Sequence, residues 1–317
     1  MPKIFVDGQE GTTGLEINER LSKRNDLEIL KISPEQRKDP QARKTFINEA
    51  DIVFLCLPDT ASRESVALTS NPKTRIIDAS TAYRADPQWT YGFPELNAEL
   101  RKEIQTSRRV SNPGCYAAGF VAAVYPLVRN GIVPRDYPLT CAAVSGYSGA
   151  GKKSIAAYEN PASEEERIKF SNPRFYALGL HHKHLPEMQK VCGLDYPPLF
   201  TPIISNYYKG MTTSVPLTRR LLSQKMDARE IHRVLSDHYS KERFVKVMPY
   251  EEEYSRDNGY FSAIDCNGTN TMEIYVFGHD EQILILSRLD NLGKGASGAA
   301  VQNMNIMLGL DEGLGLV

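Results

Sequence analysis

The sequence lacks an excess of charge, a membrane-length apolar run and any cysteine pair with metal-ligand spacing. Its 38 Lys and Arg residues balance 39 Asp and Glu residues, so the formal net charge is −1. This balance argues against nucleic acid or an anionic membrane as a partner. The five cysteines include no C-x-x-C pair, and their odd number argues against a disulfide framework. We expect a cytoplasmic protein without metal, and no signal peptide fits before an apolar strand at residues 3–6.

The first third of the chain alternates short apolar runs with helical patterns. We expect strands at 3–6, 27–32, 51–57 and 75–78, with helices at 15–21, 41–49 and 61–69 between and after them. Alternating strands and helices predict a parallel sheet covered by helices, which is a Rossmann-like, doubly wound α/β fold.

The rest of the chain has a different pattern, in which strand candidates are separated by longer loops. We expect strands at 137–144, 199–205, 211–216, 245–248, 271–277 and 282–288, and helices at 226–239 and 295–310. These elements indicate a second, α+β domain built on a mixed or antiparallel sheet. A chain of 317 residues is long enough for two such domains.

A glycine-rich turn follows the first strand. Gly8, Gly11 and Gly14 are spaced as Gly-x-x-Gly-x-x-Gly and lead into the first helix. Glycines at such a turn allow the backbone to approach a pyrophosphate, and the helix N-terminus supplies N–H donors. Thr12 and Thr13 add hydroxyl donors. We expect these five residues to bind a dinucleotide.

The end of the second strand bears on which dinucleotide binds. NAD-binding proteins usually carry an acidic residue there for the ribose hydroxyls. Here Ser33 takes that place and Arg37 lies just beyond it. A hydroxyl and a guanidinium suit a 2′-phosphate, so the sequence favours NADP(H), although the neighbouring Glu35 complicates the reading.

One cysteine has the surroundings of a nucleophile. Cys115 follows an Asn-Pro-Gly turn and precedes small residues that can open a helix. A helix N-terminus favours thiolate over thiol, so we expect a pKa below the ordinary value of about 8.5. The remaining cysteines lie in apolar strand candidates or in mixed loops, and these are Cys56, Cys141, Cys192 and Cys266.

Three of the six histidines lie in the segment Gly179–Glu187. Adjacent histidines rarely satisfy metal geometry together, whereas a histidine near neutral pKa can move a proton to a reacting oxygen. His182 and His184 are both candidates for that role. Glu187 is placed to orient one of them.

The motifs around Cys115 and His184 resemble those of the N-acetyl-gamma-glutamyl-phosphate reductase family, in its shorter form. The resemblance extends to the segments 91–95, 145–152 and 291–298. One departure is Lys183, where many members are expected to carry Arg. The family implies NADPH-dependent reduction of N-acetyl-L-glutamyl 5-phosphate to the 5-semialdehyde in arginine biosynthesis, with release of phosphate.

The resemblance also implies roles for individual residues. Cys115 would form a thioester and His184 would be the acid/base, with His182 as the alternative. Asn291 and Gly293 would lie at the cofactor. Substrate binding would involve Arg84, Asn112, Ser145, Ser148, Gly149 and Lys152, although a plain glycine turn or a surface ion pair explains some of these equally well.

The family fold implies that the C-terminal helix returns to the cofactor domain. Residues 1–114 and 293–317 would then bind NADP, while residues 115–292 would carry catalysis and oligomerisation, in a homodimer or homotetramer. Two alternatives stay open. One is a related acyl-phosphate reductase, such as aspartate-semialdehyde dehydrogenase or a lysine-pathway homologue. The other is a dinucleotide-binding redox sensor in which Cys115 is an oxidisable switch.

Overall fold

The computed structural model describes residues 1–316 and divides into two compact units. Unit 1 comprises Met1–Gly114 together with the C-terminal stretch from Ala296, and unit 2 comprises Cys115–Gly295. The chain therefore passes from one unit to the other at two peptide bonds, after Gly114 and after Gly295. None of the helices within residues 1–316 combines the length and apolar character needed to cross a membrane.

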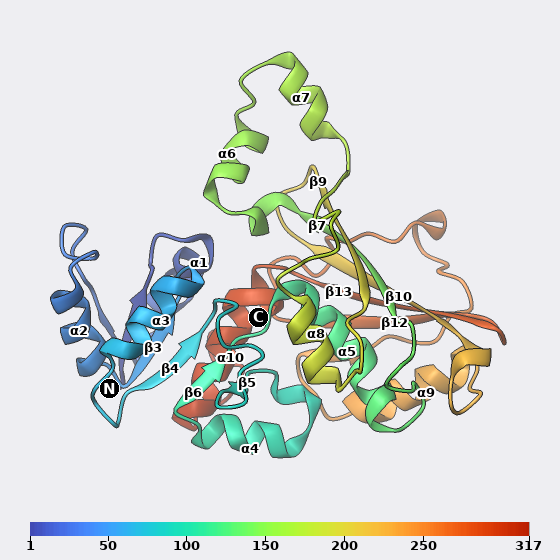
Figure 1. Ribbon diagram of the computed structural model, residues 1–317, viewed down its shortest axis with the longest axis horizontal. Coiled ribbons are helices and arrows are strands. Elements are labelled where there is room, and N and C mark those ends of the chain that lie inside the picture. Colours follow the sequence, from blue (N-terminus) through green and yellow to red (C-terminus); the bar gives the residue numbers. More distant parts are fainter. Residues whose placement is uncertain (317) are drawn as a thin grey trace. The chain divides into compact units, whose positions relative to one another are not determined.

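Unit 1 is built on a six-stranded sheet in the order β2-β1-β3-β4-β6-β5 (Figure 1). Every neighbouring pair is parallel, which confirms the doubly wound sheet that the sequence predicts. The strands are β1 (Lys3–Asp7), β2 (Glu28–Leu30), β3 (Ile52–Leu55), β4 (Arg75–Asp78), β5 (Thr90–Tyr91) and β6 (Arg109–Ser111). All residues of β3 are buried, as expected for a parallel strand covered on both faces.

The helices of unit 1 form two groups. Helix α1 (Thr12–Ser22) and helix α4 (Ala98–Thr106) contact α10 (Gly298–Leu308), and α2 (Pro40–Glu49) contacts α3 (Asp59–Leu68). Right-handed crossovers place these groups on opposite faces of the sheet. The packing of α10 in this unit confirms the expected return of the C-terminal helix. A π-helical turn at Gly293–Ser297 precedes α10, so the regular helix begins later than the sequence suggests.

Unit 2 is built on a seven-stranded mixed sheet in the order β11-β12-β13-β10-β7-β9-β8. The strands are β7 (Thr140–Gly146), β8 (Arg174–Phe175), β9 (Leu199–Ser205), β10 (Met211–Thr218), β11 (Val245–Val247), β12 (Met272–Gly278) and β13 (Gln282–Leu289). Helix α5 (Cys115–Arg129) contacts β10, β12 and β13, and α8 (Leu185–Cys192) and α9 (Ala228–Tyr239) pack beside it. The mixed sheet with helices agrees with the sequence-based prediction.

One local prediction for unit 2 was wrong. Cys192 does not lie in a loop: it ends α8, where it is buried together with Glu187 and Met188. The polar segment after residue 150 forms two short helices, α6 (Lys152–Glu159) and α7 (Glu164–Ser171). Neither buries a side chain, and both project from the rest of unit 2 (Figure 1). Their helicity is local, since Ser163 caps α7 through the Glu166 amide.

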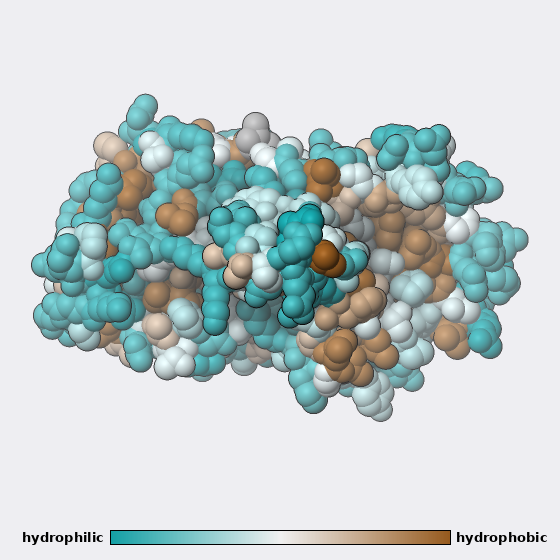
Figure 2. All heavy atoms as spheres, turned by 90° about the horizontal axis from the view of Figure 1, so that it is seen from above, coloured by the Kyte–Doolittle hydropathy of each residue, from teal (hydrophilic) through white to brown (hydrophobic). Residues whose placement is uncertain are grey.

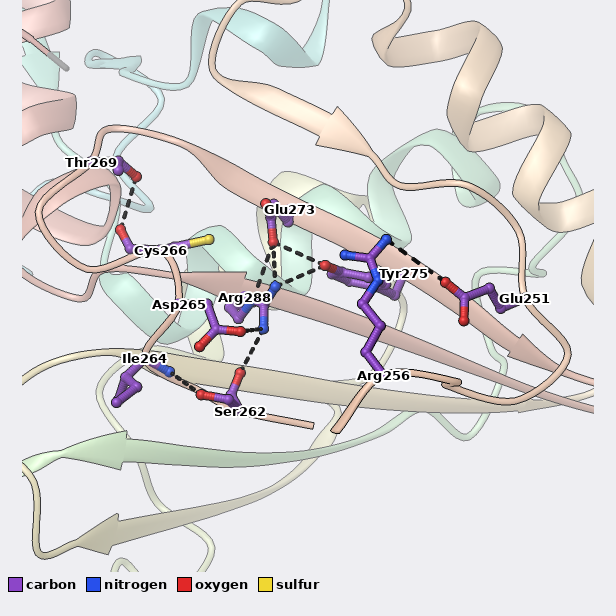
Figure 3. Close-up of polar contacts among 10 residues, drawn as sticks. All are labelled: Glu251, Arg256, Ser262, Ile264, Asp265, Cys266, Thr269, Glu273, Tyr275 and Arg288. Atoms are coloured by element: carbon purple, nitrogen blue, oxygen red, sulfur yellow. Dashed lines mark hydrogen bonds and ion pairs between the residues drawn. The ribbon is translucent and has the colours of Figure 1, made fainter. Parts of the chain in front are cut away.

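The sheet face opposite α5 and α9 carries a buried arginine. The Arg288 guanidinium donates to Asp265 and Glu273, at 2.6 Å each, and to the Tyr275 hydroxyl at 2.8 Å (Figure 3). It also donates to the Ser262 carbonyl. Because Glu273 and Tyr275 lie on β12 while Ser262 and Asp265 lie in the preceding loop, Arg288 fastens this loop to the sheet.

A buried ion pair lies at the end of β1, directly before the glycine turn. The Asp7 carboxylate accepts from the Arg43 guanidinium at 2.9 Å and from the Ser65 hydroxyl at 2.8 Å. The side chains of Asp7 and Arg43 are only 6% and 10% exposed. Since Arg43 lies on α2 and Ser65 on α3, the carboxylate joins two helices to the strand that leads into the turn.

We predict that Arg43→Met lowers the free energy of unfolding of unit 1 by about 3–5 kcal/mol, because it leaves the Asp7 carboxylate buried without its cation. Urea unfolding followed by the fluorescence of Trp89, the only tryptophan, measures this change. Lys23→Met is the control, since it removes an exposed ion pair with Glu19 in the same unit. Its expected effect is within about 0.5 kcal/mol, and equal losses in the two variants would contradict the prediction.

Candidate active site

Cys115 is the first residue of α5 and is half-buried. The dipole of this helix favours a negative charge on the thiol. The other thiols differ, because burial raises the pKa of each of Cys56, Cys141, Cys192 and Cys266. For Cys141 and Cys266 the pKa rises to about 12. Cys115 is therefore the cysteine best placed to act as a nucleophile.

A glycine backbone packs directly against this cysteine. A Cβ atom on Gly295 would lie 2.8 Å from the Cβ of Cys115, which is closer than real side chains approach. The segment before Gly295 is held by the buried Asp290. Its carboxylate accepts from the amides of Leu292 at 2.9 Å and Gly293 at 3.1 Å, and pairs with Lys209 at 3.2 Å. Asp290 thus shapes the turn that reaches Cys115.

Asn291 and Ser148, which the family resemblance assigns to cofactor and substrate, meet inside unit 2. The Asn291 side-chain amide donates to the Ser148 hydroxyl at 2.9 Å, and its oxygen accepts from the Gly210 amide at 2.8 Å. Asn291 therefore ties the turn at Tyr147–Ala150 to the start of β10. Gly293 lies two residues before Gly295 in the same π-helical segment.

The other candidates for substrate binding in unit 2 differ in exposure. Ser145 is buried near the end of β7, and its hydroxyl donates to the Gly146 carbonyl at 3.1 Å. Gly149 and Lys152 are exposed at the end of the 3-10 turn and the start of α6. The buried serines suit fixed hydrogen bonds, whereas Lys152 supplies an exposed cation.

His182 and His184 belong to an aromatic cluster around Tyr116, the residue after Cys115. The ring of Tyr116 lies 5.8 Å from each histidine ring, and the two histidine rings are 4.8 Å apart. His184 is 5% exposed, and Glu187 is buried three residues further along α8. The structure thus places both candidate histidines beside the residue that follows the candidate nucleophile.

The two ring nitrogens of His182 have different partners. Nδ1 accepts the backbone N–H of His184 at 3.1 Å, and Nε2 lies 3.4 Å from the Tyr176 hydroxyl. Burial, aided by the charge of Lys183, lowers the pKa of His182 from 6.5 to about 4. His182 is therefore neutral near pH 7.

The glycine turn of unit 1 has the geometry that the sequence predicts. Gly8 has φ +90°, and a Cβ there would lie 2.3 Å from the Cys56 carbonyl oxygen. A Cβ on Gly14 would lie 2.4 Å from the Gly8 carbonyl oxygen. Gly11 caps α1 without a side chain, so the first turn of the helix, with Thr12 and Thr13, presents backbone amides and hydroxyls.

Arg37 lies next to this turn, because its guanidinium forms an ion pair with Glu10. The Ser33 hydroxyl bonds to Glu35, whose pKa is lowered by its own backbone amide and by this hydroxyl. Backbone amides, hydroxyls and a guanidinium are groups that bind phosphates, so the donor set fits a phosphorylated dinucleotide.

Arg84 and Asn112 lie at the carboxyl edge of the parallel sheet, where ligands bind in such folds. The Arg84 Nε donates to the Asn112 carbonyl at 2.8 Å. The Asn112 side chain is buried and donates to the Ala296 carbonyl at 2.9 Å. Asn112 thus links the segment that ends at Gly114, where the chain leaves unit 1, to Ala296, where the chain enters unit 1 again.

Sequence reasoning missed Tyr176 and Asp290. Tyr176 follows the short exposed strand β8, and no spacing links it to Cys115. Asp290 immediately precedes the segment 291–298, which the sequence analysis singled out. An acidic residue directly before a glycine-rich turn is the signal that would have identified Asp290 as a capping group.

Both parts of the chain match family models. Residues 3–104 match the model for the semialdehyde dehydrogenase NAD binding domain, and residues 115–291 match that for the semialdehyde dehydrogenase dimerisation domain. The fold agrees with a solved aspartate semialdehyde dehydrogenase from Francisella tularensis, with a TM-score of 0.74 over 97% of this chain and 100% of that one, at 17% identity. The matched family models and the shared fold place the chain in the semialdehyde dehydrogenase class.

Curated relatives identify a particular family within this class. A Nostoc protein named N-acetyl-gamma-glutamyl-phosphate reductase 2 is 46% identical over 99% of both chains. A Pseudomonas putida protein with the same name is 46% identical over 97% of both chains, and a Mesorhizobium japonicum N-acetyl-gamma-glutamyl-phosphate reductase is 46% identical over 98% of this chain and 99% of its own. The chain belongs to the N-acetyl-gamma-glutamyl-phosphate reductase family.

We predict that His182 makes stability depend on pH. Its folded pKa of about 4 lies below the ordinary 6.5, so the unfolded chain binds more protons between these values. The stabilisation is complete above pH 6.5 and is lost as pH falls towards 4. Urea unfolding followed by circular dichroism should show this loss, and His182→Gln should reduce it. His181→Gln, which changes an exposed neighbour, is the control, and an identical pH profile in the His182 variant would contradict the prediction.

Proposed function

We propose that this protein reduces N-acetyl-L-glutamyl 5-phosphate to N-acetyl-L-glutamate 5-semialdehyde in the cytoplasm, with NADPH as reductant and release of phosphate, as a step of arginine biosynthesis. The observation that carries the proposal is the half-buried Cys115 at the start of α5, beside the Tyr116–His182–His184 cluster. The names of the relatives and their coverage of nearly the whole chain support the substrate.

In this proposal the Cys115 thiolate attacks the acyl-phosphate carbon. The C–O bond to phosphate breaks, phosphate leaves with its electron pair, and a thioester remains on Cys115. Backbone amides at the start of α5 stabilise the oxyanion that forms during attack. Bound NADPH supplies a hydride equivalent for the thioester carbon. Cys115 then leaves as a thiolate when the C–S bond of the thiohemiacetal breaks, and the aldehyde is released.

The role of general acid/base in this reaction is assigned to His184. His182 is the weaker candidate, since its Nδ1 accepts a backbone N–H and its pKa is lowered to about 4. A general acid/base works best with a pKa near the operating pH. Glu187, buried on α8 three residues after His184, would help to orient the imidazole.

The anionic substrate would be held by residues from two loops. Ser145, Ser148, Gly149 and Lys152 offer hydroxyls, backbone amides and a cation along one segment of unit 2. In unit 1 the Arg84 guanidinium is fixed on the carbonyls of Asn112 and Ala79. Asn112 would act by positioning, because its side chain is already bonded to the Ala296 carbonyl.

Residues 1–114 and 293–317 would bind NADP(H) through the glycine turn, Thr12, Thr13, Ser33 and Arg37. Asn291 and Gly293 would shape the loop towards the nicotinamide. Residues 115–292 would carry catalysis and form the homo-oligomer, which we propose to be a dimer or tetramer. The dimerisation-domain match supports this role, as does an apolar groove of about 580 Å³ that includes Pro216, Phe277 and Leu284. Hydrophobic side chains gather over the strands of unit 2 in Figure 2.

We predict that Arg37→Leu lowers the affinity for NADPH by about 10- to 100-fold but changes that for NADH little, because a guanidinium–phosphate hydrogen bond contributes about 1.5–3 kcal/mol. Fluorescence titration with each dinucleotide measures both constants. Lys38→Leu is the control, since it removes a neighbouring exposed cation. An equal loss for NADPH and NADH in the Arg37 variant would overturn the assignment of the 2′-phosphate.

We predict that Cys115→Ser lowers kcat about 1000-fold or more and leaves NADPH affinity unchanged, since a hydroxyl at this position is a far weaker nucleophile. The reverse reaction tests it directly: enzyme, phosphate, NADP and N-acetyl-L-glutamate 5-semialdehyde are mixed, and NADPH absorbance is followed. Cys192→Ala, at a buried thiol, should retain activity.

The same assay separates the alternatives. A signal from aspartate semialdehyde without one from N-acetyl-L-glutamate 5-semialdehyde would indicate aspartate-semialdehyde dehydrogenase. Dinucleotide binding without turnover of either aldehyde would favour a redox sensor.

A further inference from the structure

A buried asparagine on α10, Asn303, contacts the segment that leads to Cys115. Its Nδ2 donates to the Gly92 carbonyl at 2.9 Å and to Oδ1 of Asn112 at 3.3 Å. Gly92 is itself bonded to this segment, because its amide donates to the Ser111 carbonyl at 2.8 Å. Asn303 therefore holds the chain three residues before the candidate nucleophile.

The orientation of the Asn303 amide is fixed by its two partners. Both are acceptors, so a flipped amide would place Oδ1 against two oxygens. Within residues 1–316 no group donates to Oδ1, although this atom is buried. A buried amide that is bonded on one side only contributes little to stability. The two donor bonds are therefore what this residue supplies.

Asn112 connects Asn303 to the point where the chain enters unit 1 again. The Asn112 Nδ2 donates to the Ala296 carbonyl at 2.9 Å. Its backbone amide donates to the Asp78 carbonyl at 2.7 Å, and its carbonyl accepts from Arg84 at 2.8 Å. With Oδ1 bonded to Asn303, every polar group of Asn112 has a partner in unit 1. Residues 112 and 296 are thereby tied to each other.

These two residues lie close in sequence to Cys115 and Gly295. Asn112 precedes Cys115 by three residues, and Ala296 directly follows Gly295. The Gly295 backbone packs against Cys115, since a Cβ on residue 295 would lie 2.8 Å from the Cys115 Cβ. Because residues 112 and 296 are tied together, the Asn303 bonds limit the movement of Cys115 and of the backbone packed against it.

We propose that Asn303 is a positioning residue for Cys115, which it keeps in place by holding Asn112 and, through Asn112, Ala296. The proposal rests on the proposed function for the reaction in which the thiol attacks the substrate. A displacement of a reacting group by about 1 Å can lower the rate about 100-fold. Asn303 acts through its two partners and takes part in no chemical step.

Hydrogen exchange followed by mass spectrometry tests this hold without substrate or cofactor. Asn303→Leu nearly keeps the side-chain volume and removes both donor bonds. The amides of residues 111–118 and 293–298 should then exchange about tenfold faster, because fewer bonds oppose local opening. Asn305→Leu is the matched control. Asn305 is equally buried on α10, but its side chain bonds to Arg24 and to the Leu314 carbonyl. This variant should leave exchange in both segments unchanged.

Turnover and stability should respond in opposite order. In the reverse reaction Asn303→Leu should lower kcat about 10- to 100-fold, with the KM for the semialdehyde changed less than about twofold. Asn305→Leu should keep kcat within about twofold. It should nevertheless lower the urea midpoint of unfolding more than Asn303→Leu does, because both amide atoms of Asn305 have partners. A purely structural role of Asn303 would not produce this order.

A double variant tests whether Asn303 acts through Asn112. When Asn303→Leu is added to Asn112→Ala, exchange in residues 293–298 should rise less than about twofold further, since the link to Ala296 is already lost. A further tenfold rise would contradict the proposed route through Asn112.

Two other results would overturn the proposal: unchanged exchange in residues 111–118 of Asn303→Leu, or equal losses of kcat in Asn303→Leu and Asn305→Leu. If a leucine variant does not fold, Asn303→Ser and Asn305→Ser repeat the comparison, because a serine side chain at residue 303 is too short to reach Asn112. Since exchange requires no turnover, an inactive parent protein would contradict only the proposed function.

Discussion

The close packing of Gly295 against Cys115 is the constraint on which the site depends. The chain leaves unit 1 immediately before Cys115 and returns to it immediately after Gly295, so both changes of unit meet at the candidate nucleophile. A side chain at residue 295 would displace the cysteine, because its Cβ would come within 2.8 Å of the Cys115 Cβ. The buried Asp290 carboxylate holds the approaching loop through backbone amides and Lys209, which makes the contact a fixed feature of the fold.

Around this contact the polar side chains serve mainly to hold backbone in place. Asn291 bonds to Ser148 and to the Gly210 amide, and Asn112 bonds to the Ala296 carbonyl. Buried amides with all their partners present rigidify a site, since any movement would leave a polar group unsatisfied. Cys115 is left half-buried on a helix N-terminus, whereas burial raises the pKa of the other four thiols. Burial thus disfavours the thiolate form of these four cysteines.

Much of the fold and part of the site were predictable because their signals are local. The alternating strands and helices of the first third predicted the parallel sheet, and Leu199–Ser205 was predicted to the residue. The Asn-Pro-Gly turn before Cys115 predicted a helix start, which is found. The segment 152–171 was less predictable, since its short helices bury no side chains and so leave no apolar periodicity. The regular part of α10 begins later than predicted, at Gly298, because a π-helical turn precedes it.

The sequence by itself determined the residue types that carry chemistry: a glycine turn after a strand, a cysteine at a helix start and a pair of histidines before a Pro-Glu step. Turn and helix-start preferences act over a few neighbouring residues, so one segment is enough to recognise them. Only the tertiary structure decided which groups meet. Tyr176 contacts His182 because the chain between them forms a turn with two left-handed residues. Gly295, the last residue of unit 2, packs against Cys115, which is the first residue of that unit. Such contacts depend on the path of the whole chain and on burial, and burial also lowers the pKa of His182 to about 4.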